Sequence, residues 1–322
     1  MNYSKSLKLS ILTSLCLFST SCLSAKTYHL PEGYEALDGC TKQEALWKKI
    51  VSSKHKELPK FKSFGALQLM AMGVQELTKK KARQSDVAPK GWKKYLHRRG
   101  SIAKVKIVPI EGQPYSGIFK GAPCALLRLS ITYKPTKKRK FAPGLALKIL
   151  RSKEPSANVS ALYKLDGQGD NYNFFENPLS NIVPIGDGIG LKLVHTIFKR
   201  VSDYPEEILI DHLASIDSKG ERYSNPVSPR QIFFVPQGNL KFSSSKHDIR
   251  EDFHSIPEGT VIYRLYAAPE KYNQFNYDNY TDENIKEFVA ESTPIADIVS
   301  TSPFISSEFG DVGLFFRHEL RP

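Results

Sequence analysis

The chain has 322 residues and a net charge of +13, and its length allows one large domain with appendages. It has no cysteine pair at zinc-site spacing and no Gly-x-Ser-x-Gly motif, which argues against a structural zinc site and against that type of serine hydrolase. No long apolar run follows the N-terminal one, so no membrane-spanning helix is expected in the rest of the chain.

The first 25 residues are typical of an export signal. Two lysines precede an apolar stretch over residues 9–18, and small residues follow as far as Ala25. An apolar run of about ten residues is too short to span a bilayer. We therefore expect an exported protein, periplasmic or secreted, that is cut after Ala25. Processing as a lipoprotein, with a lipid anchor at Cys22, remains the alternative.

Residues 26–90 are expected to form an N-terminal helical arm. Apolar side chains recur near the helical period over 41–54, and Thr41 and Glu44 at its start have capping-box spacing. A second helix is expected at 64–84, because it is apolar at first and basic at its end, as the helix dipole favours.

From residue 97 onward the pattern changes to the alternation of strands. The strands are interrupted once, by two expected helices near the middle of the segment that begins at residue 97. The expected strands are 102–107, 126–132, 145–150, 160–164, 231–235, 260–266, 295–301 and a last one within 309–318; the expected helices are 189–201 and 205–216. Strands, then helices, then strands again predict an α+β domain over residues 91–322: an antiparallel β-barrel with inserted helices.

Two basic runs, at 79–83 and 134–140, would attract anionic lipid or cell-envelope polymers, or else they form a solvated helix end and a solvated hairpin tip. Aromatic side chains do not interleave with them, so a nucleic-acid partner is not expected. Cys40 and Cys124 remain after cleavage at Ala25. An exported protein permits a disulfide between them, but the sequence leaves open whether they come within reach.

Several short motifs follow one another within about eighty residues. Taken alone, His97 among basic residues is most simply a surface or packing histidine, although its neighbours Lys94, Arg98 and Arg99 favour the neutral imidazole that a general base for peroxide needs. The motifs are Lys94-x-x-His97-x-x-Gly100, Leu127-Arg128-Leu129-Ser130-Ile131, Gly144-Leu145-Ala146-Leu147-Lys148 and Asn171-Tyr172-Asn173-Phe174-Phe175.

In this order the motifs resemble the haem-facing half of the haem-dependent catalase-like superfamily. The corresponding family patterns are Arg-x-x-His-x-x-Gly, Val-Arg-Phe-Ser-Thr, Gly-Phe-Ala-x-Lys and Asn-x-Pro-x-Phe-Phe. The resemblance implies a catalase-like barrel in which His97 is the general base, Ser130 fixes its tautomer and Asn171 orients the bound peroxide. The asparagine motif matches only with a shift of one residue.

The same resemblance implies a haem cofactor. Lys94 and Arg128 would pair with the haem propionates, and Phe174 and Phe175 would pack near the haem face. Arg128 is otherwise a strand residue that reaches the sheet edge, and the two phenylalanines are otherwise ordinary core. The sequence ends at Pro322, before the Arg-x-x-x-Tyr helix that supplies the iron ligand in this family, so no axial ligand or other metal ligand is identified.

Two functions remain open. The first is an exported catalase-like haem protein that acts on hydrogen peroxide or an organic hydroperoxide. The second is a non-enzymatic barrel of the same fold that binds an apolar ligand or a cell-envelope partner without haem. The sequence does not predict an oligomeric state.

Overall fold

The computed structural model describes the chain in several segments. They are residues 39–53, 71, 86–92, 94, 97–114, 124–131, 143–150, 156–162, 179–180, 232–238, 240, 249–269 and 282–316. The expected export signal, both basic runs and the helices expected at 189–201 and 205–216 lie outside the described residues, and the helix expected at 64–84 is described only at residue 71, which is helical.

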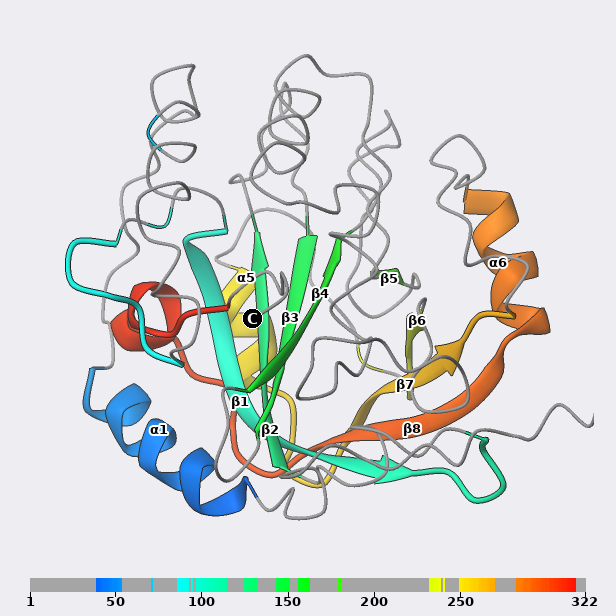
Figure 1. The fold of residues 1–322 in the computed structure, drawn as a ribbon, viewed down its shortest axis with the longest axis horizontal. Helices are drawn as coiled ribbons and strands as arrows, with labels where there is room; N and C mark the ends of the chain where they lie inside the picture. The colour runs from blue at the N-terminus through cyan, green and yellow to red at the C-terminus, as the bar shows by residue number, and fades with distance from the viewer. Residues whose placement is uncertain are drawn as a thin grey trace, which may run out of the picture.

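Eight antiparallel strands form one strongly curled sheet (Figure 1), in which each strand pairs with the next and β1 also pairs with β8. In chain order the elements are α1 (Cys40–Ser52), β1 (Arg99–Pro109), β2 (Cys124–Ile131), β3 (Pro143–Ile149), β4 (Ala157–Leu162), β5 (Leu179–Ser180), β6 (Ile232–Pro236), α5 (Ile249–His254), β7 (Val261–Ala267), α6 (Asp282–Glu291), β8 (Thr293–Ser300) and the π-helix η5 (Phe309–Gly313).

The strands agree with the seven expected before residue 302 to within a few residues at their ends. A curled antiparallel sheet with few helices among the described segments agrees with the α+β class. Sequence reasoning did not find α5, α6 and the short strand β5.

The inner face of the sheet is the main core of the protein. Alternate residues of each strand point inward, as the pleat of a strand requires. On β1 to β4 the inward residues are Ala103, Val105, Ile107, Ala125, Leu127, Leu129, Leu145, Leu147, Ile149, Val159 and Ala161. Phe253 of α5 and Phe304 join this cluster with ring centroids 6.1 Å apart.

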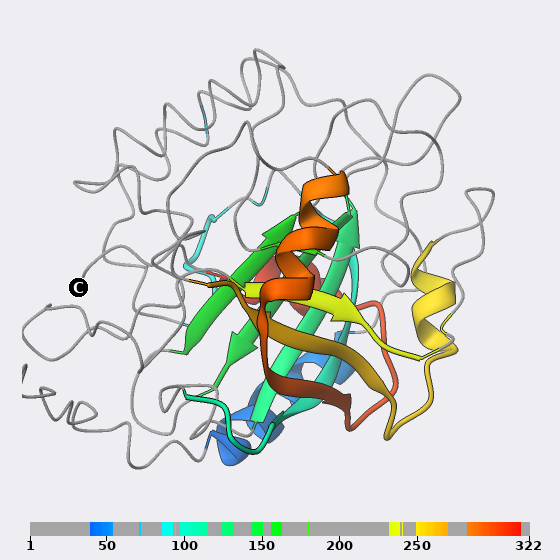
Figure 2. The ribbon, with the colours of Figure 1, turned by 90° about the vertical axis from the view of Figure 1, so that its right-hand side faces the viewer.

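The outer face of the sheet is also covered, which explains why β2 is buried along both of its faces. Over β1 and β2, the apolar side of α1 packs with the C-terminal segment; this cluster includes Leu46, Ile50, Ile102, Leu126, Leu150 and Leu314. Figure 1 shows α1 and the red η5 on the same side of the molecule as β1. Phe288 of α6 packs against Phe233 of β6 and against Ala268, the residue after β7. Figure 2 shows the orange α6 on this side of the sheet.

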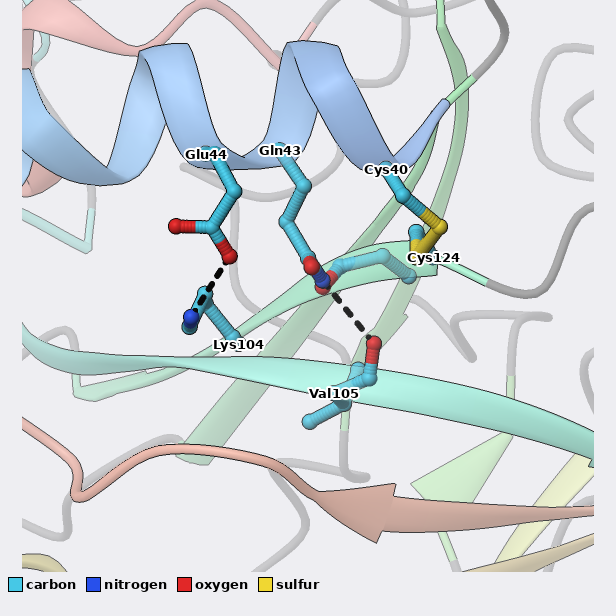
Figure 3. The surroundings of a disulfide bond; sticks show 7 residues. Cys40, Gln43, Glu44, Lys104, Val105 and Cys124 are labelled. Carbon is cyan, nitrogen blue, oxygen red and sulfur yellow. Dashed lines mark hydrogen bonds and ion pairs between the residues drawn. A yellow bond between two sulfur atoms is a disulfide. The ribbon is translucent and has the colours of Figure 1, made fainter. Parts of the chain in front are cut away.

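A disulfide and a buried glutamine join α1 to the sheet (Figure 3). Cys40, the first residue of α1, is bonded to Cys124 at the start of β2. One turn later, Gln43 Nε2 donates to the backbone oxygens of Val105 and Ala125, at 3.0 and 2.6 Å. The disulfide that the sequence left open is therefore present, and it fixes the position of α1 on β1 and β2.

The expected capping box of α1 is wrong. The N-cap is Gly39 and no side chain caps the helix. Thr41 lies inside the helix, and Glu44 instead pairs with Lys104 of β1 at 2.7 Å. The start of the helix is set by packing, because a Cβ at Gly39 would lie 2.3 Å from the backbone carbonyl of Leu150.

The strand expected within 309–318 is also wrong in its described part. Residues Phe309–Gly313 form a π-helix, and only Leu314 pairs with another strand-like residue, in an isolated bridge to Val87. Gly310 of the π-helix packs so closely on β1 that a Cβ there would lie 2.9 Å from Cγ2 of Ile102. In the part of the chain that the structure describes, no helix is long and apolar enough to cross a membrane.

Candidate functional site

The candidate site lies on the outer face of β1, β2 and β3, on the side opposite the main core. Ser130 is paired with Gly100 on one side and Gly144 on the other. Two residues earlier on the same face, Arg128 is paired with Ile102 and Ala146. Three of these four neighbours, Gly100, Gly144 and Ala146, are small, which leaves room for the segment that precedes β1 to reach the polar groups of β2.

His97, from that preceding segment, contacts Ser130. Its Nδ1 lies 3.2 Å from Ser130 Oγ, and Ser130 Oγ donates its hydrogen to the carbonyl oxygen of Gly144, also at 3.2 Å. A hydroxyl has a single hydrogen, so in this arrangement Ser130 accepts a hydrogen bond from Nδ1–H of the imidazole. Nε2 is then the basic atom of the ring.

The surroundings of His97 favour its neutral form. Burial, and after it the positive charges of Arg128 and Lys94, together lower the pKa of His97 from its ordinary value of 6.5 to about 3. A contact with the Ser130 backbone opposes this shift without cancelling it. At neutral pH the imidazole is therefore uncharged.

Arg128 is 1% exposed, and its side chain is hydrogen-bonded to other residues of the chain. Its Nη2 donates to Asp311 Oδ1 of η5 at 2.5 Å and to the backbone oxygen of His97 at 2.7 Å. The carboxylate partner of Arg128 is thus supplied by the chain itself. Sequence reasoning missed Asp311, because it lies 183 residues from Arg128 and no local motif marks it.

This pairing bears on the haem propionate that Arg128 was expected to bind. The guanidinium already has a buried carboxylate partner, so Arg128 does not fit the expected role in this arrangement. Its Nε and the Oδ2 of Asp311 are buried without hydrogen-bond partners, which leaves one donor and one acceptor unused at this pair.

Lys94 lies close to the pair of Arg128 and Asp311 and is half-buried. Its pKa is lowered well below the ordinary value, mainly by burial and by the Arg128 charge, while Asp311 acts in the opposite direction. Its Nζ lies 5.5 Å from the centroid of the Phe316 ring. Lys94 therefore lies near Arg128 and Asp311.

The end of the Gly144–Lys148 motif forms a second buried polar cluster. Lys148 Nζ donates to Asp86 Oδ1 at 3.0 Å, to Asn158 Oδ1 at 2.9 Å and to the backbone oxygen of Phe315 at 2.8 Å. These contacts join β3 and β4 to the segment before β1 and to the C-terminal segment, so the role of Lys148 here is structural.

A second histidine also contacts serines, on the other face of β1. Nε2 of His254, the last residue of α5, lies 3.3 Å from Oγ of both Ser101 and Ser306. His254 is exposed, whereas His97 is half-buried. The two histidines thus differ in environment although both contact serine, and this makes His254 a useful control.

The remaining expected site residues, Asn171, Phe174 and Phe175, lie outside the described residues. Among the residues that the structure does describe, no group of three or more His, Cys, Asp or Glu side chains is placed to hold a metal ion. Comparison with models of known protein families gave no match, and comparison with curated proteins found no similar sequence.

Proposed function

We propose that this protein is a catalase-like, haem-associated protein that acts on hydrogen peroxide or an organic hydroperoxide. The observation that carries the proposal is the contact between His97 and Ser130, in which a neutral imidazole is held by Nδ1 at the outer face of the barrel. The motif order along the chain supports the same assignment. Haem, when bound, supplies the redox chemistry of peroxide cleavage.

The role of the chain in this proposal is to hold and move a proton. Nε2 of His97 accepts the proton of the peroxide, and Ser130 keeps the ring in the tautomer that allows it. The amide of Asn171 orients the peroxide. Arg128, since it is bonded to Asp311, holds the His97 backbone rather than a propionate, and a propionate would have to use Lys94 or the unused Nε of Arg128.

Export is part of the same proposal. A disulfide persists in oxidising compartments and is rare in the cytosol of mesophiles, so the Cys40–Cys124 bond supports a periplasmic or secreted location. The N-terminal signal pattern supports it independently. A lipid anchor at Cys22 and attachment to the cell envelope through the basic runs remain subordinate proposals.

A hemin titration of the purified protein tests the cofactor, and a peroxide assay tests the reaction. We expect a saturable one-to-one Soret band, and peroxide consumption that His97→Gln abolishes while leaving hemin bound. The matched control is His254→Gln, which removes the other serine-bonded histidine and should leave the rate unchanged. Hemin binding with an unchanged rate in His97→Gln would remove His97 from the mechanism.

The absence of a saturable Soret band would favour the second function, a catalase-like barrel that binds an apolar ligand or a cell-envelope partner without haem. One observation favours it in particular. Arg128, the expected anchor of a propionate, is neutralised by Asp311 within the chain, as a protein without an anionic cofactor would require.

A further inference from the structure

We infer that Asp311 is a positioning residue for His97. It holds the Arg128 guanidinium, and Arg128 in turn holds the backbone of His97 so that the imidazole reaches Ser130. The inference deepens the proposed function, on which the catalytic meaning of His97 rests. The positioning of His97 by Asp311 does not itself require haem.

The geometry makes Arg128 the link between the two residues. A single nitrogen, Nη2, donates both to the Asp311 carboxylate and to the His97 carbonyl oxygen, so moving the guanidinium would change both contacts together. Asp311 and Arg128 are 2% and 1% exposed, so water does not replace either partner easily. A buried charge that loses its counter-ion is strongly destabilised.

Gly100 limits where the guanidinium can lie. A Cβ at Gly100 would come within 2.9 Å of both the guanidinium carbon and Nη2, so the side chain of Arg128 passes directly over the glycine. In this position over Gly100, the guanidinium meets the Asp311 carboxylate and also reaches the His97 carbonyl oxygen.

His97 requires such support because its backbone is in the left-handed region, with φ of +50°. A non-glycine residue in this region is strained unless its surroundings hold it there. Among the contacts that hold His97, Arg128 bonds its carbonyl oxygen and Ser130 bonds its ring. Loss of the Arg128 bond weakens the hold on the His97 backbone.

The test reads the tautomer of His97 directly. In protein without hemin, long-range proton–nitrogen NMR spectra of ¹⁵N-histidine-labelled samples distinguish Nδ1–H from Nε2–H for each ring. We expect His97 to be in the Nδ1–H form in the native protein. In Asp311→Asn we expect a mixture of both tautomers at His97 and an unchanged signal from His254.

Two further variants separate positioning from general damage. Asp311→Glu retains the carboxylate and should restore the single tautomer. Asp297→Asn breaks another Asp–Arg pair, with Arg264 on β7 and β8, and should leave the tautomer of His97 as it is. A folded Asp311→Asn protein with the native tautomer at His97 would overturn the inference.

If Asp311→Asn does not fold, Arg128→Lys provides the decisive measurement. Lysine keeps the charge beside Asp311 but lacks the planar fork that lets one group reach two acceptors in fixed directions. We expect a mixture of His97 tautomers here too, and an unchanged tautomer would overturn the inference. Because these spectra need no hemin, a protein that binds no haem but shows the tautomer change refutes the proposed function and leaves the positioning role of Asp311 standing.

Discussion

Protonation of His97 is opposed by burial and by two nearby cations, and this has a consequence for stability. The unfolded chain binds a proton at His97 near pH 6.5, whereas the folded protein binds it only near pH 3. Between these values the unfolded state holds more protons, so the free energy of unfolding rises with pH. The contribution of His97 is fully present above pH 6.5 and decreases as the pH falls toward 3.

The expected slope is up to about 1.4 kcal/mol per pH unit within that window. It is measured by comparing urea unfolding of the native protein and His97→Gln between about pH 7 and about pH 4.5, where Asp86, with a pKa of about 2, does not yet titrate in the folded state. Parallel pH curves for the two proteins would contradict the assigned pKa of His97.

Asp86 provides a second prediction at the residue scale. It pairs with the fully buried Lys148, and its pKa is lowered to about 2 by that lysine, by Ser156 and by Lys42, although burial acts in the opposite direction. Because Asp86→Asn leaves a buried ammonium without its carboxylate, we expect it to lower the free energy of unfolding by about 3 kcal/mol.

The pair between Arg264 and Asp297, which is only partly buried, is the matched control for Asp86. Arg264 is 37% exposed, so Asp297→Asn should cost less than about 1 kcal/mol. Chemical denaturation of both variants at neutral pH makes the comparison. Equal losses would mean that burial of the lysine is not what gives the Asp86 pair its importance.

At the scale of elements, the disulfide determines how firmly α1 is held on the sheet. Cys40 and Cys124 are 84 residues apart, so the bond closes a long loop in the unfolded chain. We expect the double variant Cys40→Ser, Cys124→Ser to lose about 2–4 kcal/mol of stability. Thermal unfolding of the native protein with and without reductant should show the same difference, which the double variant should no longer show.

Gly39 determines where α1 begins. Alanine there would place its Cβ 2.3 Å from the carbonyl of Leu150, and backbone cannot move aside as a flexible side chain can. We expect Gly39→Ala to lower the melting temperature and to slow formation of the neighbouring disulfide on refolding. Ser52→Ala, at the exposed end of the same helix, should do neither. A native-like Gly39→Ala protein would show that α1 can shift along the sheet.

At the scale of the whole molecule, the sheet closes on itself through β5, the shortest strand among the described residues. Within that part of the chain, β5 has one residue pair with β4 and two with β6, whereas β1 and β2 share eight. Local opening is easiest where few contacts must break. We therefore expect hydrogen exchange to be faster at β5 and the facing edge of β6 than in β2. Equal protection of the β6 and β2 amides from exchange, measured by mass spectrometry, would show that the sheet is as stable where it closes at β5 as it is at β2.

The fold and the candidate site differ in how much of each could be predicted from the sequence. The strands were predictable because alternation of apolar and polar residues is a local property, and it placed the ends of β2, β3, β6, β7 and β8 to within two residues. The helix around residues 41–54 was found for the same reason, but its capping was not. The start of α1 depends on the backbone at Leu150, more than a hundred residues away.

The site shows the same division. The motifs brought His97, Ser130 and Arg128 to attention, and the structure places these three side by side. The partner of Arg128 could not be predicted, because nothing near Asp311 in the sequence distinguishes it from other acidic residues. Asn171, Phe174 and Phe175 stay predictions from the motifs alone.

By itself, the sequence determined the order of most strands and the α+β class, since these follow from periodicity, whereas His97 and Ser130 were singled out by a resemblance and not by periodicity. Only the tertiary structure decided that Cys40 meets Cys124, that Asp311 neutralises Arg128 and that Arg128 holds His97. The physical reason is that each of these contacts joins segments far apart in the chain, and such contacts depend on how the whole sheet curls and what packs on its outer face.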